Sequence, residues 1–267
     1  DSSSSGGADT PPHKIIAAWG SNSASMSYHG DQRVSGEIRF YGNGEETASF
    51  FAAMDAEAEG SILLTASDYT VPNQKTTYTD FCFSKDDLVA QGLPADDGSA
   101  HIIGIEAVLN NSNSITNVHH IIVNTSEDEN GACSNGNNAD NFMYVWAFGQ
   151  SNFQAPATTG FRYGPDGNGA FQSISMEVHY DNPEFKNNII DNSGFRFYYT
   201  TKLRQHDIGI FELADPRVSL LGEEVGSGVT QHTITCPGSC SNGNFNQDVT
   251  IFLQGLHMHD TGERMVT

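Results

Sequence analysis

Short alternating segments between glycine- and asparagine-rich turns most limit what this chain can fold into. Apolar and polar residues alternate as in strands, and helical periodicity is nearly absent. The strand-like runs are 37–41, 102–109, 118–123, 173–180, 195–201, 208–213 and 249–257. A short helix is expected only at 85–91. The pattern predicts an all-β protein built from antiparallel sandwiches.

Charge and hydropathy exclude several classes of partner. The chain has 267 residues, enough for two domains with cores of their own. A net charge of −21 repels nucleic acid and anionic membrane surfaces. No run of 18 apolar residues is present, so no transmembrane helix is expected. The acidity is explained more simply by solubility than by attraction of a cationic substrate.

Cysteines and sequons favour an oxidising, extracellular or secretory compartment. The four cysteines are Cys82, Cys133, Cys236 and Cys240, and the sequons predict glycosylation at Asn110 and Asn124.

Histidines supply the candidate metal ligands. His257 and His259 share one strand face, because residues i and i+2 project together. His119 and His120 point apart in a regular strand, and can reach one metal only at a strand end or a bulge. His179 lies in a third strand-like run. Imidazoles without thiolates suit copper or zinc.

Taken singly, these histidines also have ordinary explanations. A lone histidine such as His179 is more often hydrogen-bonded in a core or on a surface, and neighbouring pairs are only sometimes ligands. The remaining histidines are assigned to structural or surface roles: His13, His29, His101, His206 and His232.

The amino-acid sequence around these histidines resembles that of the copper type II, ascorbate-dependent monooxygenases. Val118-His119-His120 resembles the family's histidine pair, Glu177–Pro183 its EVHYxNP motif, and Leu256–Gly262 its LHxHxxG motif. Residues 193–204 and 209–213 are similar to the opening of its second copper domain. Upstream, 15–41 resembles the end of a DOMON domain.

This resemblance implies two copper sites and one disulfide. His119, His120 and His179 would hold an electron-transfer copper, and His257 and His259 an oxygen-binding copper. Ascorbate would supply electrons, and O₂ and a small molecule, an amine or phenol, would be the substrates. Cys82 and Cys133 would pair with each other.

The resemblance also implies an incomplete second site. The family's methionine ligand lies further downstream than Thr267, and neither Met258 nor Met265 fits its position. Cys236 and Cys240 would have later partners in relatives, although a direct bridge or a CxxxC metal site stays open.

The expected architecture is two jelly-roll-like copper sandwiches in tandem, the second truncated. The expected segments are a DOMON-like tail at 1–45, a first copper domain at 46–185 and a second at 190–267. The function implied is a secreted copper monooxygenase, of which this chain is a fragment. The alternative is a non-catalytic extracellular structural or adhesive module that keeps the fold and assembles with further copies or other chains.

Overall fold

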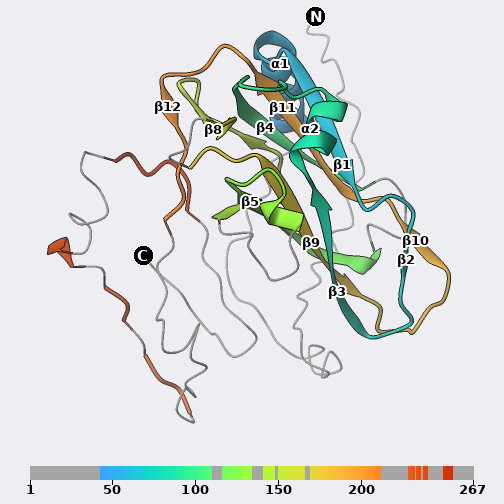
Figure 1. Ribbon diagram of the computed structural model, residues 1–267. Coiled ribbons are helices and arrows are strands. Elements are labelled where there is room, and N and C mark those ends of the chain that lie inside the picture. Colours follow the sequence, from blue (N-terminus) through green and yellow to red (C-terminus); the bar gives the residue numbers. More distant parts are fainter. Residues whose placement is uncertain are drawn as a thin grey trace, which may run out of the picture. The chain divides into compact units, whose positions relative to one another are not determined.

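The computed structural model describes residues 43–109, 116–133, 141–147, 150–165, 169–211, 228–231, 233–235, 237–239 and 249–254. The chain divides into two compact units, Tyr41–Ala214 and a second formed by Asp1–Phe40 with Asp215–Thr267. Every named helix and strand lies in the first unit (Figure 1). The DOMON-like segment 15–41 lies almost wholly in the second unit and outside the described residues.

Two main sheets build the first unit. One has the order β1-β11-β4-β8-β12, with β7 paired to β4, and the other has the order β3-β9-β5-β6. The pairs are antiparallel except β8 with β12. The strands of the first sheet are β1 (Gly60–Thr65), β4 (Ala100–Val108), β7 (Phe153–Gln154), β8 (Thr159–Tyr163), β11 (Gly194–Thr200) and β12 (His206–Asp207).

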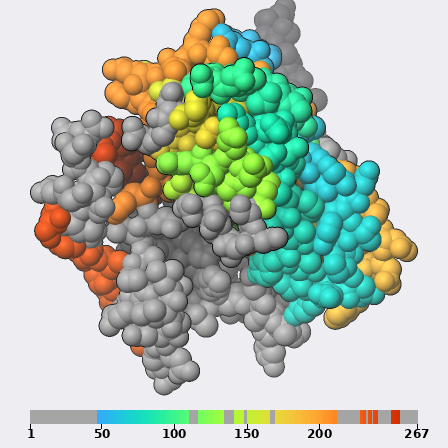
Figure 2. Space-filling model, viewed as in Figure 1, coloured from blue at the N-terminus to red at the C-terminus, as the bar shows by residue number. Residues whose placement is uncertain are grey.

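The second sheet carries the site residues. Its strands are β3 (Thr76–Phe83), β5 (Val118–Ser126), β6 (Asn141–Ala147) and β9 (Ser173–Asp181). A separate two-stranded ladder joins β2 (Tyr69–Val71) to β10 (Ile189–Asp191). In the space-filling view, the teal segment around α2 and the green segment around β5 both reach the surface on the viewed face (Figure 2).

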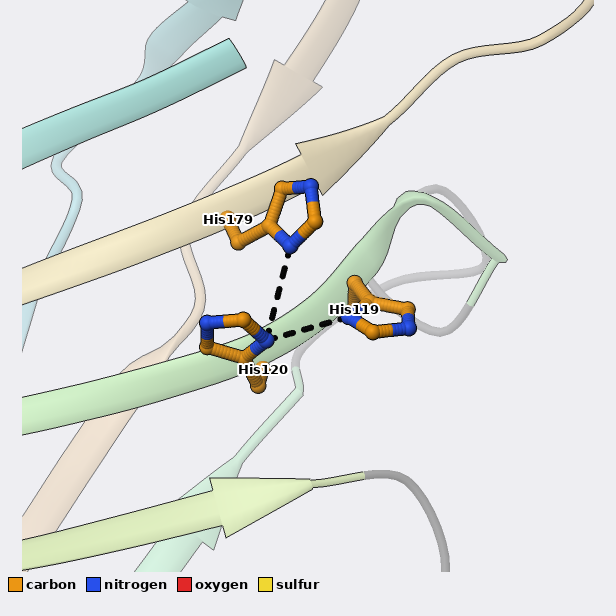
Figure 3. A group of neighbouring side chains, drawn as sticks. All are labelled: His119, His120 and His179. Atoms are coloured by element: carbon orange, nitrogen blue, oxygen red, sulfur yellow. Dashed lines mark hydrogen bonds between the residues drawn. The ribbon is translucent and has the colours of Figure 1, made fainter. Parts of the chain in front are cut away.

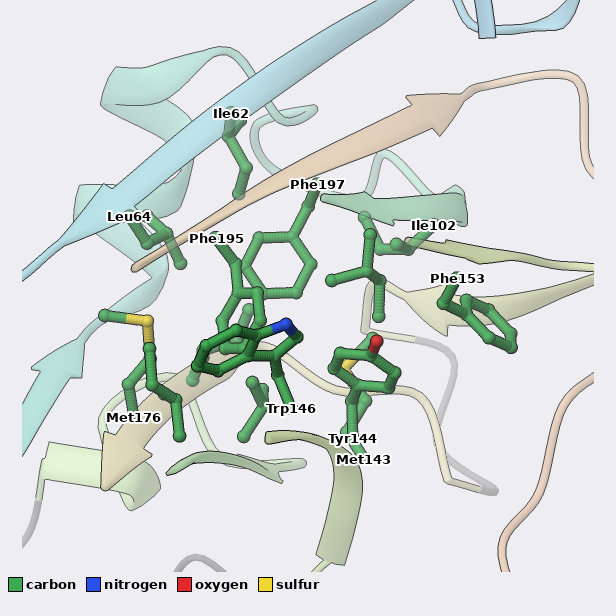
Figure 4. Packing of buried hydrophobic residues seen from close by; sticks show 14 of the residues in the cluster. Ile62, Leu64, Ile102, Met143, Tyr144, Trp146, Phe153, Met176, Phe195 and Phe197 are labelled. Atoms are coloured by element: carbon green, nitrogen blue, oxygen red, sulfur yellow. The ribbon is translucent and has the colours of Figure 1, made fainter. Parts of the chain in front are cut away.

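A single apolar core lies between the two main sheets. Phe195 and Phe197 of β11 pack in one cluster with Trp146 of β6 and Met176 of β9 (Figure 4). Ile121 of β5 is fully buried in the same cluster. The burial of large apolar side chains from both sheets stabilises the sandwich, because apolar surface is removed from water. The predicted antiparallel sandwich is confirmed for this unit.

Two helices flank the sheets. Helix α1 (Asn43–Glu57) packs Phe50 and Met54 against Ile103 of β4. A Cβ atom at Gly104 would lie 2.3 Å from the Met54 sulfur, so a larger residue at this position would require the Met54 side chain to move. Helix α2 (Lys85–Gln91) begins at a capping box in which Ser84 and Asp87 bond reciprocally. Neither helix is long and apolar enough to cross a membrane, and the described residues contain no other candidate.

After residue 181 the structure differs from the sequence-based expectation at two strand-like runs, 208–213 and 249–257, in the parts that it describes. Strand β11 lies between β1 and β4, and the compact unit extends to Ala214. The polar stretch at 181–194 lies within this unit, and the division into copper domains at 46–185 and 190–267 stays a prediction. Residues 208–211 form no strand, and the short β12 precedes them instead. Residues 249–254 also form no strand.

The connection between β9 and β10 is held by one buried side chain. The Asn182 amide donates to the Lys186 carbonyl at 2.9 Å and accepts the Lys186 N–H at 2.9 Å. Asn182 is 1% exposed, so these bonds satisfy its polar atoms inside the fold. These turn residues thus build an ordered loop between β9 and β10.

Candidate metal centre

A β-bulge at His119 creates the histidine cluster. Val118 pairs with Tyr180 of β9, and His120 pairs with His179, so two steps on β5 match one step on β9. His119 is the extra residue. A bulge bends the strand locally and redirects a side chain that regular pleating would send to the opposite face. The sequence-based condition that the pair can share a metal only at a strand end or bulge is thereby met.

Three imidazoles converge at this bulge. The Nδ1 atoms of His119 and His120 lie 3.0 Å apart, and those of His179 and His120 lie 3.4 Å apart (Figure 3). One ligand nitrogen from each of the three residues can be chosen so that all lie within 4.8 Å of one another. His179 is 1% exposed, whereas His119 and His120 are half-buried. The cluster therefore has a fixed inner wall and a partly open outer side.

The cluster fits a metal ion bound by nitrogen. Two imidazole nitrogens that share one tetrahedral ion at about 2.0–2.1 Å lie roughly 3.3 Å apart, close to the two Nδ1 separations here. Cys82 and Cys133 are bonded to each other, so neither offers a thiolate. Such a set of imidazoles suits copper or zinc.

The electrostatics of the cluster keep His179 neutral. Burial, together with the nearby His120 and His119, lowers the pKa of His179 to about 4. A neutral imidazole keeps a lone pair for a metal, so proton competition at this ligand is weak near pH 7.

Acidification is expected to destabilise the chelator-treated protein between about pH 6.5 and pH 4. In this window the unfolded chain binds a proton at His179 that the folded chain excludes, so the free energy of unfolding falls as the pH falls. The loss amounts to on the order of 3 kcal/mol. Urea denaturation across the window, compared with His179→Gln, measures it. Identical pH slopes in the two proteins would contradict the prediction.

A tyrosine on the neighbouring strand extends the site. Tyr78 of β3 pairs with His179 in the ladder, and their rings stack with centroids 4.2 Å apart and planes 14° apart. Tyr78 is 54% exposed, so one of its faces covers the imidazole while the rest meets solvent. No sequence motif marks Tyr78 as a site residue. The alternation in β3 could have placed it on a face, but not opposite His179.

Tyr78→Ala is expected to weaken copper binding about 2- to 10-fold, because a stacked aromatic pair contributes about 0.5–1.5 kcal/mol. Tyr78→Phe keeps the ring and serves as the matched control. Competition titration with a chromogenic Cu(I) chelator measures both affinities. Equal losses in the two variants would show that the hydroxyl group, and not stacking, matters.

Two carboxyl groups lie two residues further along the same strands. Asp80 of β3 pairs directly with Glu177 of β9. Burial raises the pKa of Glu177, and the charge of Asp80 raises it further. Like charges placed opposite each other destabilise a ladder, and a cation held nearby would reduce that repulsion.

The remaining predicted residues divide into two groups. The Cys82–Cys133 disulfide is present, with Cα atoms 5.0 Å apart, and joins β3 to the short 3-10 helix η2 (Gly131–Cys133). Asn124 lies within β5, half-buried, between β9 and β6, and its glycosylation stays a prediction. The other predicted residues lie outside the described part of the chain: Asn110, Cys236, Cys240, His257 and His259.

The sandwich and its converging imidazoles define a candidate histidine-ligated metalloprotein domain. Residues 62–187 match the family described as copper type II ascorbate-dependent monooxygenase, N-terminal domain. These residues include all three histidines of the cluster. Residues 62–187 therefore form an N-terminal domain of the copper type II, ascorbate-dependent monooxygenase family.

Similar proteins agree with this membership. The chain is 31% identical to human dopamine beta-hydroxylase over 219 residues. This alignment covers 76% of the chain and 33% of that relative. It is 27% identical over 233 residues to tyramine beta-hydroxylase of Caenorhabditis briggsae, covering 81% and 37%. DBH-like monooxygenase protein 1 of Gallus gallus is 30% identical over 203 residues, covering 71% and 30%. The chain thus spans about a third of the length of these curated relatives.

Proposed function

We propose that His119, His120 and His179 bind one copper ion that serves electron transfer in an ascorbate-dependent monooxygenase. The observation that carries the proposal is the bulge at His119, which brings two sequence neighbours to one side of β5 beside His179. Family membership favours copper over zinc for these three imidazoles.

The protein's own residues set the properties of this site. Copper bound there would supply reversible one-electron transfer. His179 is held by the ladder between β3 and β5 and stays neutral, while Tyr78 stacks over its ring. Half-buried His119 and His120 leave the outer side accessible. A rigid ligand set limits rearrangement when the charge of a metal changes.

The proposed reaction belongs to the longer protein type that the relatives represent. We propose that His257 and His259 contribute to a second copper site, and that an activated C–H bond of a small amine or phenol is hydroxylated with O₂ and ascorbate. Two relatives are named tyramine beta-hydroxylase and dopamine beta-hydroxylase. Tyramine and dopamine are both amines, which supports an amine as the substrate. The disulfide supports a secretory location, because such bonds persist in oxidising compartments.

Copper content and ascorbate reduction test the proposal together. The purified chain is loaded with Cu(II), freed of excess metal, and followed by elemental analysis and electron paramagnetic resonance. We expect at least one copper per chain, with a nitrogen-ligated signal that ascorbate removes. Hydroxylation of a phenethylamine is then assayed under O₂ with ascorbate.

The outcomes separate the two functional readings. Failure to bind copper at the three histidines would overturn the proposed site. Copper binding and reduction without hydroxylation, in a longer protein that also contains the second site, would indicate a non-catalytic extracellular module. Hydroxylation that requires copper and ascorbate would establish the enzyme.

A further inference from the structure

The segment that leaves β11 is held to the first sheet by an unusual density of polar contacts. This exit segment comprises residues 201–207. Thr201 donates its backbone N–H to the Glu59 carboxylate at 2.7 Å, and Lys202 pairs with the same carboxylate at 3.2 Å. The Arg204 guanidinium donates to the carbonyls of Pro156 at 3.0 Å and Thr159 at 2.8 Å. Side chains and carbonyls, rather than apolar packing, thus fix this segment.

A fully buried histidine lies at the centre of these contacts. His101 of β4 is 0% exposed, and its Nδ1 accepts the backbone N–H of Arg204 at 2.9 Å. A backbone N–H can only donate, so Nδ1 carries no proton. The proton of the neutral ring is therefore on Nε2, which lies 2.7 Å from the Asp207 carboxylate and donates to it. Both ring nitrogens bind the exit segment.

The fold provides space for this arrangement. Gly160 of β8 pairs with Asp207 of β12, directly beside the His101 side chain. A Cβ atom at Gly160 would lie 2.5 Å from the Cβ of His101, far inside contact distance. A residue with a side chain would displace the imidazole, so β8 and β12 can close over His101 only with glycine at this position.

Burial opposes a second proton on His101, and the nearby charges act in both directions. The Asp207 carboxylate also accepts a hydrogen bond from the Arg162 Nε at 3.2 Å. The Arg204 guanidinium forms an ion pair with the Glu57 carboxylate. Burial lowers the pKa of His101, Asp207 acts in the opposite direction, and Arg162 and Arg204 lower it further. A second proton would sit on Nδ1, where the Arg204 N–H already points. Two donors would then face each other, and the bond would be lost.

We propose that His101 and Asp207 form an acid-released clasp that holds the exit segment against the edge of the sandwich. The neutral ring joins Arg204 and Asp207 at once, and protonation removes one of these two attachments. The proposal concerns residues remote in sequence from the metal cluster and does not depend on metal binding.

The direction of the pH effect follows from linkage. The released segment exposes His101, whose ordinary pKa is 6.5, whereas the closed clasp excludes the proton. The clasp is therefore fully stable above about pH 6.5 and weakens as the pH falls toward the lowered value. Because one proton is involved, closure should weaken by up to about tenfold for each pH step of one.

Nuclear magnetic resonance of the whole chain tests the clasp. Long-range ¹H–¹⁵N spectra should show only the Nε2-protonated form of His101 near pH 7.5. Amide protection factors for residues 204–207, corrected for intrinsic exchange, should fall as the pH decreases below 6.5. Residues 196–199 of β11 should keep their protection and serve as an internal reference.

Two variants separate the clasp from general acid sensitivity. His101→Asn places a carbonyl oxygen near the position of Nδ1 but cannot be protonated, so protection at 204–207 should lose its dependence on pH. His206→Asn removes the exposed histidine of the same segment and should leave that dependence intact. An Nδ1-protonated ring in the native protein, or the same pH dependence in His101→Asn, would overturn the proposal. The spectra of the native protein decide the question even if the variant does not fold.

Discussion

Replacement of His179 by alanine is expected to abolish copper binding at the three-histidine cluster while the sandwich stays folded. His179 is the buried member of the cluster and lies in β9, between the strands that carry Tyr78 and His120. Loss of a ligand should exceed the roughly 10- to 100-fold effects of changing residues that support ligands. A decrease of more than about 100-fold in Cu(I) affinity is therefore expected, measured by chelator competition.

His206→Ala is the matched control for this experiment. It also removes one imidazole, but from an exposed position on β12 outside the cluster. Circular dichroism should show the same β-type spectrum in both variants and the native protein. Unchanged copper affinity in His179→Ala would contradict the assignment, whereas a lost spectrum would require His179→Gln to be examined instead.

Removal of the Cys82–Cys133 disulfide is expected to cause a large loss of stability. The bridge closes a loop with a sequence separation of 51, and it ties β3, at the edge of the second sheet, to η2. The loop-entropy relation gives about 4 kcal/mol for a loop of this length. Cys82→Ser with Cys133→Ser should lower the free energy of unfolding by that order, as measured by urea denaturation.

The double variant also tests whether the metal cluster depends on the bridge. Tyr78 lies four residues before Cys82 on β3, while His120 and His179 are held by β5 and β9. Copper binding should persist below the denaturation midpoint. A stability loss below about 1 kcal/mol would show that the unfolded chain gains little freedom when the bridge is absent.

The sequence predicted best what depends on local pattern. The alternating runs at 102–109, 118–123 and 173–180 became β4, β5 and β9, and the short helix at 85–91 became α2. Local alternation and capping chemistry suffice for such elements. The disulfide and the members of the histidine cluster came from resemblance to a family, and the structure places both together.

What escaped prediction depends on partners distant in the chain. Helix α1 has its apolar residues in one run, Phe50 to Met54, rather than in a clear stripe, so periodicity did not reveal it. The position of β11 between β1 and β4 could not be predicted, because nothing local in its sequence indicates which strands it pairs with. His101 and Asp207 are 106 residues apart in the chain, and only the fold brings the imidazole and the carboxylate within hydrogen-bond distance.

The bulge at His119 has a consequence for how such a site arises and disappears. Deleting the one extra residue on β5 would restore regular pairing with β9 and leave the apolar residues 121 and 123 facing the core. The sandwich would survive, but one imidazole would be lost and the trio could not form. Metal binding is thus encoded here by the length of a strand as much as by its residues. A single in-frame codon deletion at His119 therefore separates a metal-binding sandwich from an inert one.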